Sequence, residues 1–164
     1  LVIFTRDWHP ANHKSFASQH EGKNVFEVID LNGIQQVLWP DHCVQGTRGS
    51  EFHNDINLDI PNLYIFKKGM NPEVDSYSGF YDNDHKTSTG LSEFLKEKGV
   101  TEIVVCGLAT DFCVSYTAID GAKDGFDTTF IIDASEGISP DLRPTFKEMV
   151  NNGIKIVFST QYLS

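Results

Sequence analysis

Cys113 lies in the stretch GLATDFCVSYTA, residues 107–118, just after small residues and at the start of an expected helix. A thiol in the first turn of a helix faces unpaired backbone N–H groups and the positive end of the helix dipole, and both favour the thiolate. Free cysteine is also one of the residue types most often buried as a small hydrophobic group. This stretch alone therefore leaves Cys113 as either a nucleophile or a structural thiol.

Two segments in the first fifty residues combine carboxylate and imidazole side chains. TRDWHPANHKSF contains Asp7, His9 and His13, and LWPDHCVQGT contains His42 beside Cys43. An Asp-x-His pair after a strand can direct both side chains the same way, and such mixed ligands suit Zn²⁺, Fe²⁺ or Mn²⁺. Histidines of a surface loop are the alternative explanation for an isolated pair. The two segments together predict an open metal site.

The elements that must position these residues follow an alternating pattern. From residue 60 onward, short apolar runs alternate with longer amphipathic ones, as in repeated strand–helix–strand units. Strands are expected at 62–69, 102–108, 128–134 and 154–160, with helices at 87–99, 112–124 and 139–153. The first sixty residues contain a short strand and a long irregular segment, of the kind that usually carries function.

The pattern predicts an α/β fold with a mostly parallel sheet, which binds ligands beyond the carboxyl ends of its strands. Asp7, Lys68 and Cys113 each follow an expected strand, so the three side chains could meet at one edge.

Length and charge exclude several classes of protein. The 164 residues, 40% hydrophobic and 22% charged, predict a single domain with its own core. A formal net charge of −10 disfavours nucleic acid and anionic membrane surfaces as partners. No apolar run approaches the length of a membrane span, and the first residues lack the features of a signal peptide. Three irregularly spaced cysteines favour reduced thiols and a cytoplasmic location.

Four segments occur in an order that resembles the nicotinamidases (pyrazinamidase/nicotinamidase) of the isochorismatase-like cysteine hydrolase superfamily. They are TRDWHPANHKSF, QQVLWPDHCVQGT, FKKGMNPEVDSYSGF and GLATDFCVSYTA. The resemblance covers essentially residues 1–164 and implies one domain with a three-layer α/β/α sandwich and a Rossmann-like sheet. It implies hydrolysis of nicotinamide, a small-molecule partner, to nicotinate and ammonia in NAD salvage. Assembly into a homo-oligomer is left open.

The same resemblance implies a metal centre. Asp7, His9 and His42 match the residues that bind one divalent ion, with Zn²⁺ expected and Fe²⁺ or Mn²⁺ as alternatives. His13 is either a further ligand or a residue just behind the ligands. The metal and its waters would anchor the ring nitrogen and orient the substrate.

The resemblance also implies the catalytic groups. Cys113 matches the nucleophile, which forms a thioester with the substrate, and Lys68 matches the lysine that favours the thiolate. Lys67 would face the opposite side of its strand. Leu108 and Ala109 match a cis peptide of the family that turns the Ala109 N–H toward the oxyanion, beside the Cys113 N–H.

Two aromatic residues and two further cysteines complete the expected assignments. Trp39 and Tyr77 match the aromatic walls that flank the pyridine ring, although core packing would otherwise explain both. Cys106 is expected in the core, and Cys43 is expected to be structural.

One part of the family pattern has no match in these residues. The family's catalytic aspartate ends a first strand in a D-x-Q-x-D-F type motif, which does not occur between Leu1 and Ser164. We therefore expect the family's first strand and helix to be missing from this stretch. Two alternatives stay open: another amidohydrolase of the superfamily, acting on a carbamoyl or ureido amide, and a catalytically inactive binding domain.

Overall fold

The computed structural model describes residues 1–162, and the chain forms two compact units. Unit 1 comprises Leu1–Ser76 and Asp82–Thr87, and unit 2 comprises Tyr77–Tyr81 and Ser88–Ser164. All the expected metal ligands belong to unit 1, whereas the expected nucleophile, Cys113, belongs to unit 2.

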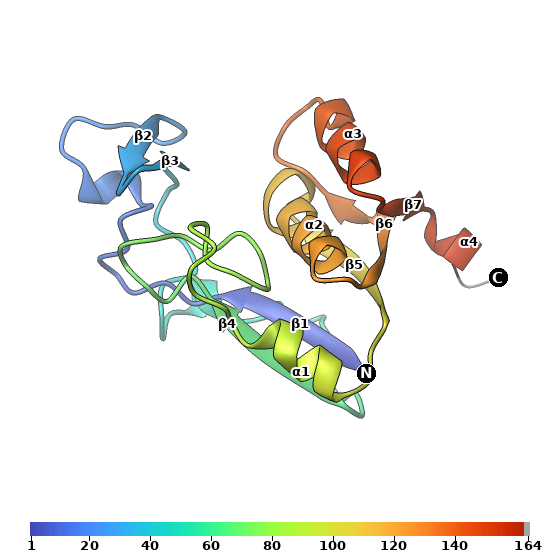
Figure 1. The fold of residues 1–164 in the computed structure, drawn as a ribbon. Coiled ribbons are helices and arrows are strands. Elements are labelled where there is room, and N and C mark those ends of the chain that lie inside the picture. The colour runs from blue at the N-terminus through green and yellow to red at the C-terminus, as the bar shows by residue number, and fades with distance from the viewer. Residues whose placement is uncertain (163–164) are drawn as a thin grey trace. The chain divides into compact units, whose positions relative to one another are not determined.

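A parallel pair of strands forms the base of unit 1. Strands β1 (Val2–Asp7) and β4 (Leu63–Lys68) are rich in β-branched and aromatic residues, which suit a pleated and partly buried surface. They lie side by side in Figure 1 and pair from Val2 opposite Leu63 to Asp7 opposite Lys68. The register therefore brings an acid and a base together at the carboxyl ends of both strands.

A small hairpin lies within the segment that the sequence pattern left irregular. Strands β2 (Val28–Leu31) and β3 (Ile34–Val37) pair antiparallel around Asn32 and Gly33, whose φ angles are 55° and 85°. Two left-handed residues in a two-residue loop suit a hairpin turn, and Asn-Gly is its strongest sequence signal. The irregular assignment was therefore wrong here, because four-residue strands are too short to show a clear alternation.

Unit 2 is built on a parallel sheet with the strand order β5-β6-β7. The strands are β5 (Glu102–Leu108), β6 (Asp127–Glu136) and β7 (Lys155–Val157), and both pairings are parallel. Together with β1 and β4, these strands confirm an α/β fold that is mostly parallel.

Helices α2 (Ser115–Lys123) and α3 (Arg143–Asn151) lie beside this sheet (Figure 1). The shorter helices of unit 2 are α1 (Leu91–Glu97) and α4 (Ser159–Tyr162). The buried apolar core joins α2, α3 and the sheet, and its members are Val114, Ala118, Ile119, Phe130, Met149 and Ile154. No helix within residues 1–162 is long and apolar enough to cross a membrane.

Several expected boundaries move in the structure. The helix expected from residue 112 begins with one π-helical turn, Thr110–Val114, before α2. The last strand ends at Val157, earlier than expected, and α4 follows it. The expectation that Cys106 lies in the core was wrong: burial alternates along β5, and Cys106 lies on its exposed side.

Candidate active site and metal centre

Backbone hydrogen bonds join the two histidine-containing segments of unit 1. The His9 N–H donates to the Cys43 carbonyl oxygen over 3.1 Å, and the Gln45 N–H donates to the His9 carbonyl oxygen over 2.8 Å. Further along, the Trp39 N–H donates to the Ser15 carbonyl oxygen over 2.8 Å. The loop after β1 and the segment after β3 are therefore held side by side.

This arrangement gathers three of the expected metal ligands. One ligand atom from each of Asp7, His9 and His42 lies within 4.8 Å of the others. Nδ1 of His9 lies 2.8 Å from the carbonyl oxygen of Gly69, and Nδ1 of His42 lies 2.8 Å from that of Pro40. A carbonyl oxygen can only accept, so each Nδ1 carries the proton and each Nε2 presents a lone pair. The residues therefore fit a divalent ion, which imidazole binds through a lone pair of this kind.

Gly69 fixes the His9 ring from the end of β4. Its φ is +64°, a conformation that glycine adopts readily, and a Cβ at this position would lie 2.6 Å from His9 Nδ1. Glycine is therefore required both by the backbone and by the close approach of the ring.

His13 has the opposite tautomer. Its ring is fully buried, and its Nδ1 lies 2.7 Å from Ser15 Oγ and 3.2 Å from the Ser15 backbone nitrogen. The Ser15 backbone N–H can only donate, so Nδ1 of His13 must hold the lone pair and Nε2 the proton. Burial lowers the pKa of His13 to about 4, which keeps the ring neutral at pH 7. His13 therefore directs an N–H from Nε2, which has no hydrogen-bond partner among the described residues.

Asp75 is a buried carboxylate that the sequence analysis missed. It is only 3% exposed, and a carboxylate oxygen of Asp75 lies within 4.8 Å of ring nitrogens of His9 and His13. Asp75 accepts hydrogen bonds from the Ser76 N–H over 2.8 Å and from Gln36 Nε2 over 3.2 Å. Its only sequence signal is a lone acid in a loop, which by itself does not distinguish a buried carboxylate from an exposed one.

Lys68 is a buried lysine next to the expected metal ligands. It is 4% exposed, and its ammonium group pairs with the Asp7 carboxylate and donates to the Ser76 carbonyl oxygen over 2.8 Å. Burial alone would raise the pKa of Asp7, but the charge and hydrogen bond of Lys68 outweigh burial and lower it. Lys67 instead is exposed and lies over the Trp8 ring, as strand alternation predicts.

In unit 2, Cys113 is half-buried within the π-helical turn Thr110–Val114, which we call the Cys113 turn. The peptide bond between Leu108 and Ala109, just before the turn, is cis. The Val114 N–H donates to the Ala109 carbonyl oxygen over 3.0 Å, and the Thr117 hydroxyl donates to the Cys113 carbonyl oxygen over 2.6 Å. Hydrogen bonds within the turn and from α2 therefore hold the backbone of the cysteine.

The two expected aromatic walls belong to different units. Tyr77 is 8% exposed and packs edge-on against Phe112 of the Cys113 turn, with ring centroids 5.3 Å apart. Trp39, in unit 1, packs edge-on with Phe26 at 5.8 Å. Within the units, the structure thus groups Tyr77 with the cysteine and Trp39 with the histidine-containing segments.

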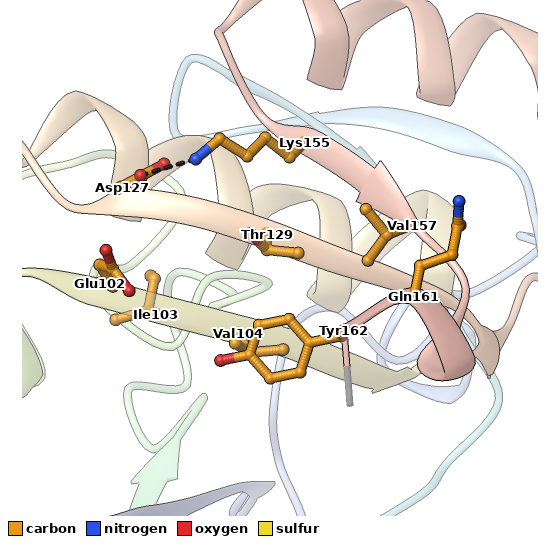
Figure 2. Close-up of a pocket in the computed structure, with 9 residues that line it drawn as sticks. All are labelled: Glu102, Ile103, Val104, Asp127, Thr129, Lys155, Val157, Gln161 and Tyr162. Carbon is orange, nitrogen blue, oxygen red and sulfur yellow. Dashed lines mark hydrogen bonds and ion pairs between the residues drawn. The ribbon is translucent and has the colours of Figure 1, made fainter. Parts of the chain in front are cut away.

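A shallow pocket on the β5-β6-β7 sheet contains none of the expected site residues. Figure 2 shows the side chains of Val104, Thr129 and Val157 along the strands, with an ion pair of 2.7 Å between Lys155 and Asp127 at one end. Its lining offers neither a nucleophilic thiol nor a set of metal ligands. The candidate site residues lie elsewhere: the candidate metal ligands and Lys68 are in unit 1, and the Cys113 turn is in unit 2.

In unit 1, two paired parallel strands end in Asp7 and Lys68, and in unit 2 a parallel strand is followed by the Cys113 turn. The family model described as "Isochorismatase domain" matches residues 1–162. The chain therefore belongs to the isochorismatase family.

Within that family, the chain is similar to enzymes that hydrolyse amides. It is 45% identical to the nicotinamidase of Acinetobacter baylyi over 99% of this chain and 76% of that protein. The structure of the nicotinamidase/pyrazinamidase of Acinetobacter baumanii superposes with a TM-score of 0.94 and 47% identity, over 98% of this chain and 78% of that one. The pyrazinamidase of Pyrococcus horikoshii, determined in complex with zinc, has a TM-score of 0.75 and 38% identity, over 96% and 75%. These similarities make the chain an amidohydrolase.

Proposed function

We propose that the protein hydrolyses nicotinamide to nicotinate and ammonia. The observation that carries the proposal is the 45% identity to a nicotinamidase along 99% of the chain. The site supports it as well, because one ligand atom from each of Asp7, His9 and His42 lies within 4.8 Å of the others. The Nδ1 contacts of His9 and His42 leave a lone pair on each Nε2.

Asp7, His9 and His42 would hold one divalent ion, Zn²⁺ in the first instance. When bound, the ion supplies an anchor for the ring nitrogen of the substrate. His13 would not ligate, because its Nε2 carries a proton, and it would instead donate a hydrogen bond from behind the ligands. Trp39 and Tyr77 would flank the flat pyridine ring and hold the carboxamide in one orientation.

Cys113 would act as the nucleophile. Its thiolate attacks the amide carbon, and the N–H groups of Ala109 and Cys113 hold the oxyanion. The C–N bond then breaks, ammonia leaves with the proton from the thiol, and a thioester remains. Water hydrolyses the thioester and restores the thiol. Lys68 would favour the thiolate through its positive charge.

This activity would place the protein in NAD salvage, where nicotinamide is recovered as nicotinate. A cytoplasmic location belongs to the same proposal, because three irregularly spaced cysteines favour reduced thiols.

Ammonia release from nicotinamide tests the proposal directly. We expect turnover by the Zn²⁺-loaded full-length protein, none by its Cys113→Ala variant, and near-normal turnover by Cys106→Ala, the matched control on the exposed side of β5. An N-carbamoyl amide serves as the alternative substrate. Release of ammonia from that amide but not from nicotinamide would contradict the proposal, and so would an active Cys113→Ala protein.

Metal binding is tested separately. Chelation or His42→Ala should weaken nicotinamide binding in calorimetric titrations of the Cys113→Ala protein, and added Zn²⁺ should restore binding only where His42 is present. Nicotinamide binding that is indifferent to chelator would refute the metal site.

A further inference from the structure

Asp111 joins the Cys113 turn to a distant loop of unit 2. Its Oδ1 accepts the backbone N–H of Ile138 over 2.9 Å, and its Oδ2 accepts that of Ser139 over 2.8 Å. Each carboxylate oxygen thus binds an amide from 27 or 28 residues further along the chain. Hydrogen bonds to an ionised carboxylate are about twice as strong as neutral ones, so the pair is a firm connection. We call it the Asp111 clamp.

The clamp lies where two strands end together. The β5–β6 register continues to Leu108 opposite Glu136, and the Gly107 N–H donates to Ser135 Oγ over 3.1 Å. The chain then leaves β5 into the Cys113 turn and leaves β6 into the loop that holds the two clamped amides. Asp111 lies two residues before Cys113. Its hydrogen bonds therefore join the segments that follow β5 and β6, beyond the last paired residues of the two strands.

Gly137 leaves room for the clamp. A Cβ at this position would lie 3.2 Å from Asp111 Oδ1 and 2.5 Å from Leu142 Cδ2. The φ of Gly137 lies outside the left-handed region, so an alanine here would disturb the packing without straining the backbone. The loop thus packs closely around the Asp111 carboxylate.

We propose that Asp111 is a positioning residue for the cysteine chemistry: its carboxylate fixes the Cys113 turn against the loop after β6. The inference rests on the proposed role of Cys113 as the nucleophile. A thiolate attacks productively only within a narrow geometry, and a displacement of about 1 Å can cost on the order of 100-fold in rate. In this account Asp111 acts through its two amide hydrogen bonds and not through proton transfer.

The chain offers a matched control for the clamp. Asp133, on the neighbouring strand β6, accepts the Ser159 N–H and the Ser159 hydroxyl, each over 2.7 Å. Both oxygens of this acid likewise accept hydrogen bonds from a later segment, but that segment is the start of α4, and Asp133 does not contact the Cys113 turn through these bonds. Substitutions of the two aspartates remove similar bonds from the same unit.

Steady-state kinetics of the Zn²⁺-loaded protein with nicotinamide provide the first readout. We expect Asp111→Ala to lower kcat by about 10- to 100-fold while KM changes by less than about threefold, since the clamp positions the reacting thiol. Asp111→Asn keeps one acceptor oxygen and should lie between Asp111→Ala and the unmodified protein. Asp133→Ala should leave kcat within about twofold of its normal value. Gly137→Ala should also lower kcat, as Asp111→Asn does, because the added Cβ crowds the Asp111 carboxylate.

Alkylation by iodoacetamide gives a readout that does not depend on the substrate. Peptide mapping measures labelling of Cys113 relative to exposed Cys106 in the same molecule, which corrects for general unfolding. We expect this ratio to fall in the order unmodified, Asp111→Asn, Asp111→Ala. A pure charge effect would instead speed labelling equally in both variants, and that result would overturn the proposal, as would an unchanged ratio.

The two readouts separate the two hypotheses. If neither the unmodified protein nor any variant releases ammonia from nicotinamide, but Cys113 is labelled in the expected order, the proposed substrate is wrong and the positioning role stands. If turnover is normal in Asp111→Ala, or falls equally in Asp133→Ala, the positioning role is wrong and the proposed function stands.

Discussion

Replacing Lys68 with methionine should make the metal-free protein markedly less stable. Methionine preserves most of the volume of the buried stem but removes the charge that pairs with Asp7. Two unit charges about 4 Å apart interact by about 4 kcal/mol at an effective dielectric constant of about 20. Removing one partner of a buried pair typically costs about 3–5 kcal/mol, because the other charge stays behind unpaired. Asp7 keeps 21% of its side chain exposed, so we expect the lower end, about 3 kcal/mol.

The pH dependence of this loss has a definite sign. In the unmodified protein the pKa of Asp7 is lowered, so the pair contributes stability above the ordinary carboxyl pKa and loses it as the pH falls through the lowered value. Without Lys68, burial dominates and raises the pKa of Asp7. The folded variant then binds a proton at Asp7 more readily than the unfolded chain, so its free energy of unfolding rises as the pH falls. The difference in free energy of unfolding between the variant and the unmodified protein should therefore shrink from pH 7 to pH 5.

Urea unfolding in the presence of chelator measures the effect. Lys67→Met is the matched control, because the Lys67 ammonium lies 4.3 Å from the Trp8 ring centroid on the exposed side and should contribute at most about 1 kcal/mol. Equal losses for the two variants at pH 7 would refute the reasoning. If the loss of unfolding free energy in Lys68→Met grew toward pH 5, Lys68 would not be the cause of the lowered pKa of Asp7.

Three further outcomes follow from the site geometry. Gly69→Ala should weaken Zn²⁺ binding about 10- to 100-fold in a competition assay with a chromophoric chelator, because the added Cβ displaces the His9 ring; an unchanged Kd would contradict this contact. His13→Asn should retain one bound Zn²⁺ per chain by elemental analysis, whereas loss of the metal would show that His13 ligates. Tyr77→Ala should raise the nicotinamide KM more than about tenfold, equivalent to roughly 1.4 kcal/mol, and Tyr77→Phe should leave it nearly unchanged; equal effects would point to the hydroxyl instead of the ring.

The candidate residues of the site could be chosen from the sequence because the choice depends on residue type and local spacing. Asp7 and His9 lie two residues apart after a strand, and Cys113 follows a strand directly, so residue type and position along the chain predict the candidates. The α/β pattern was equally local, since apolar periodicity distinguishes strands from helices without any knowledge of their partners. The family assignment followed from four segments in one order, and the matching family model confirms it.

The tautomers and the buried partners were decided only by the tertiary structure. Whether a histidine presents a lone pair or an N–H depends on what its other nitrogen meets, and Gly69 reaches His9 from sixty residues away. For the same reason, nothing near Asp75 or Asp111 in the sequence shows that one carboxylate is buried beside His9 and that the other binds the loop after β6. The sequence by itself thus determined which groups are available for chemistry, because that depends on residue type. Their protonation, burial and hydrogen-bond partners arise from contacts between distant segments, which only folding brings together.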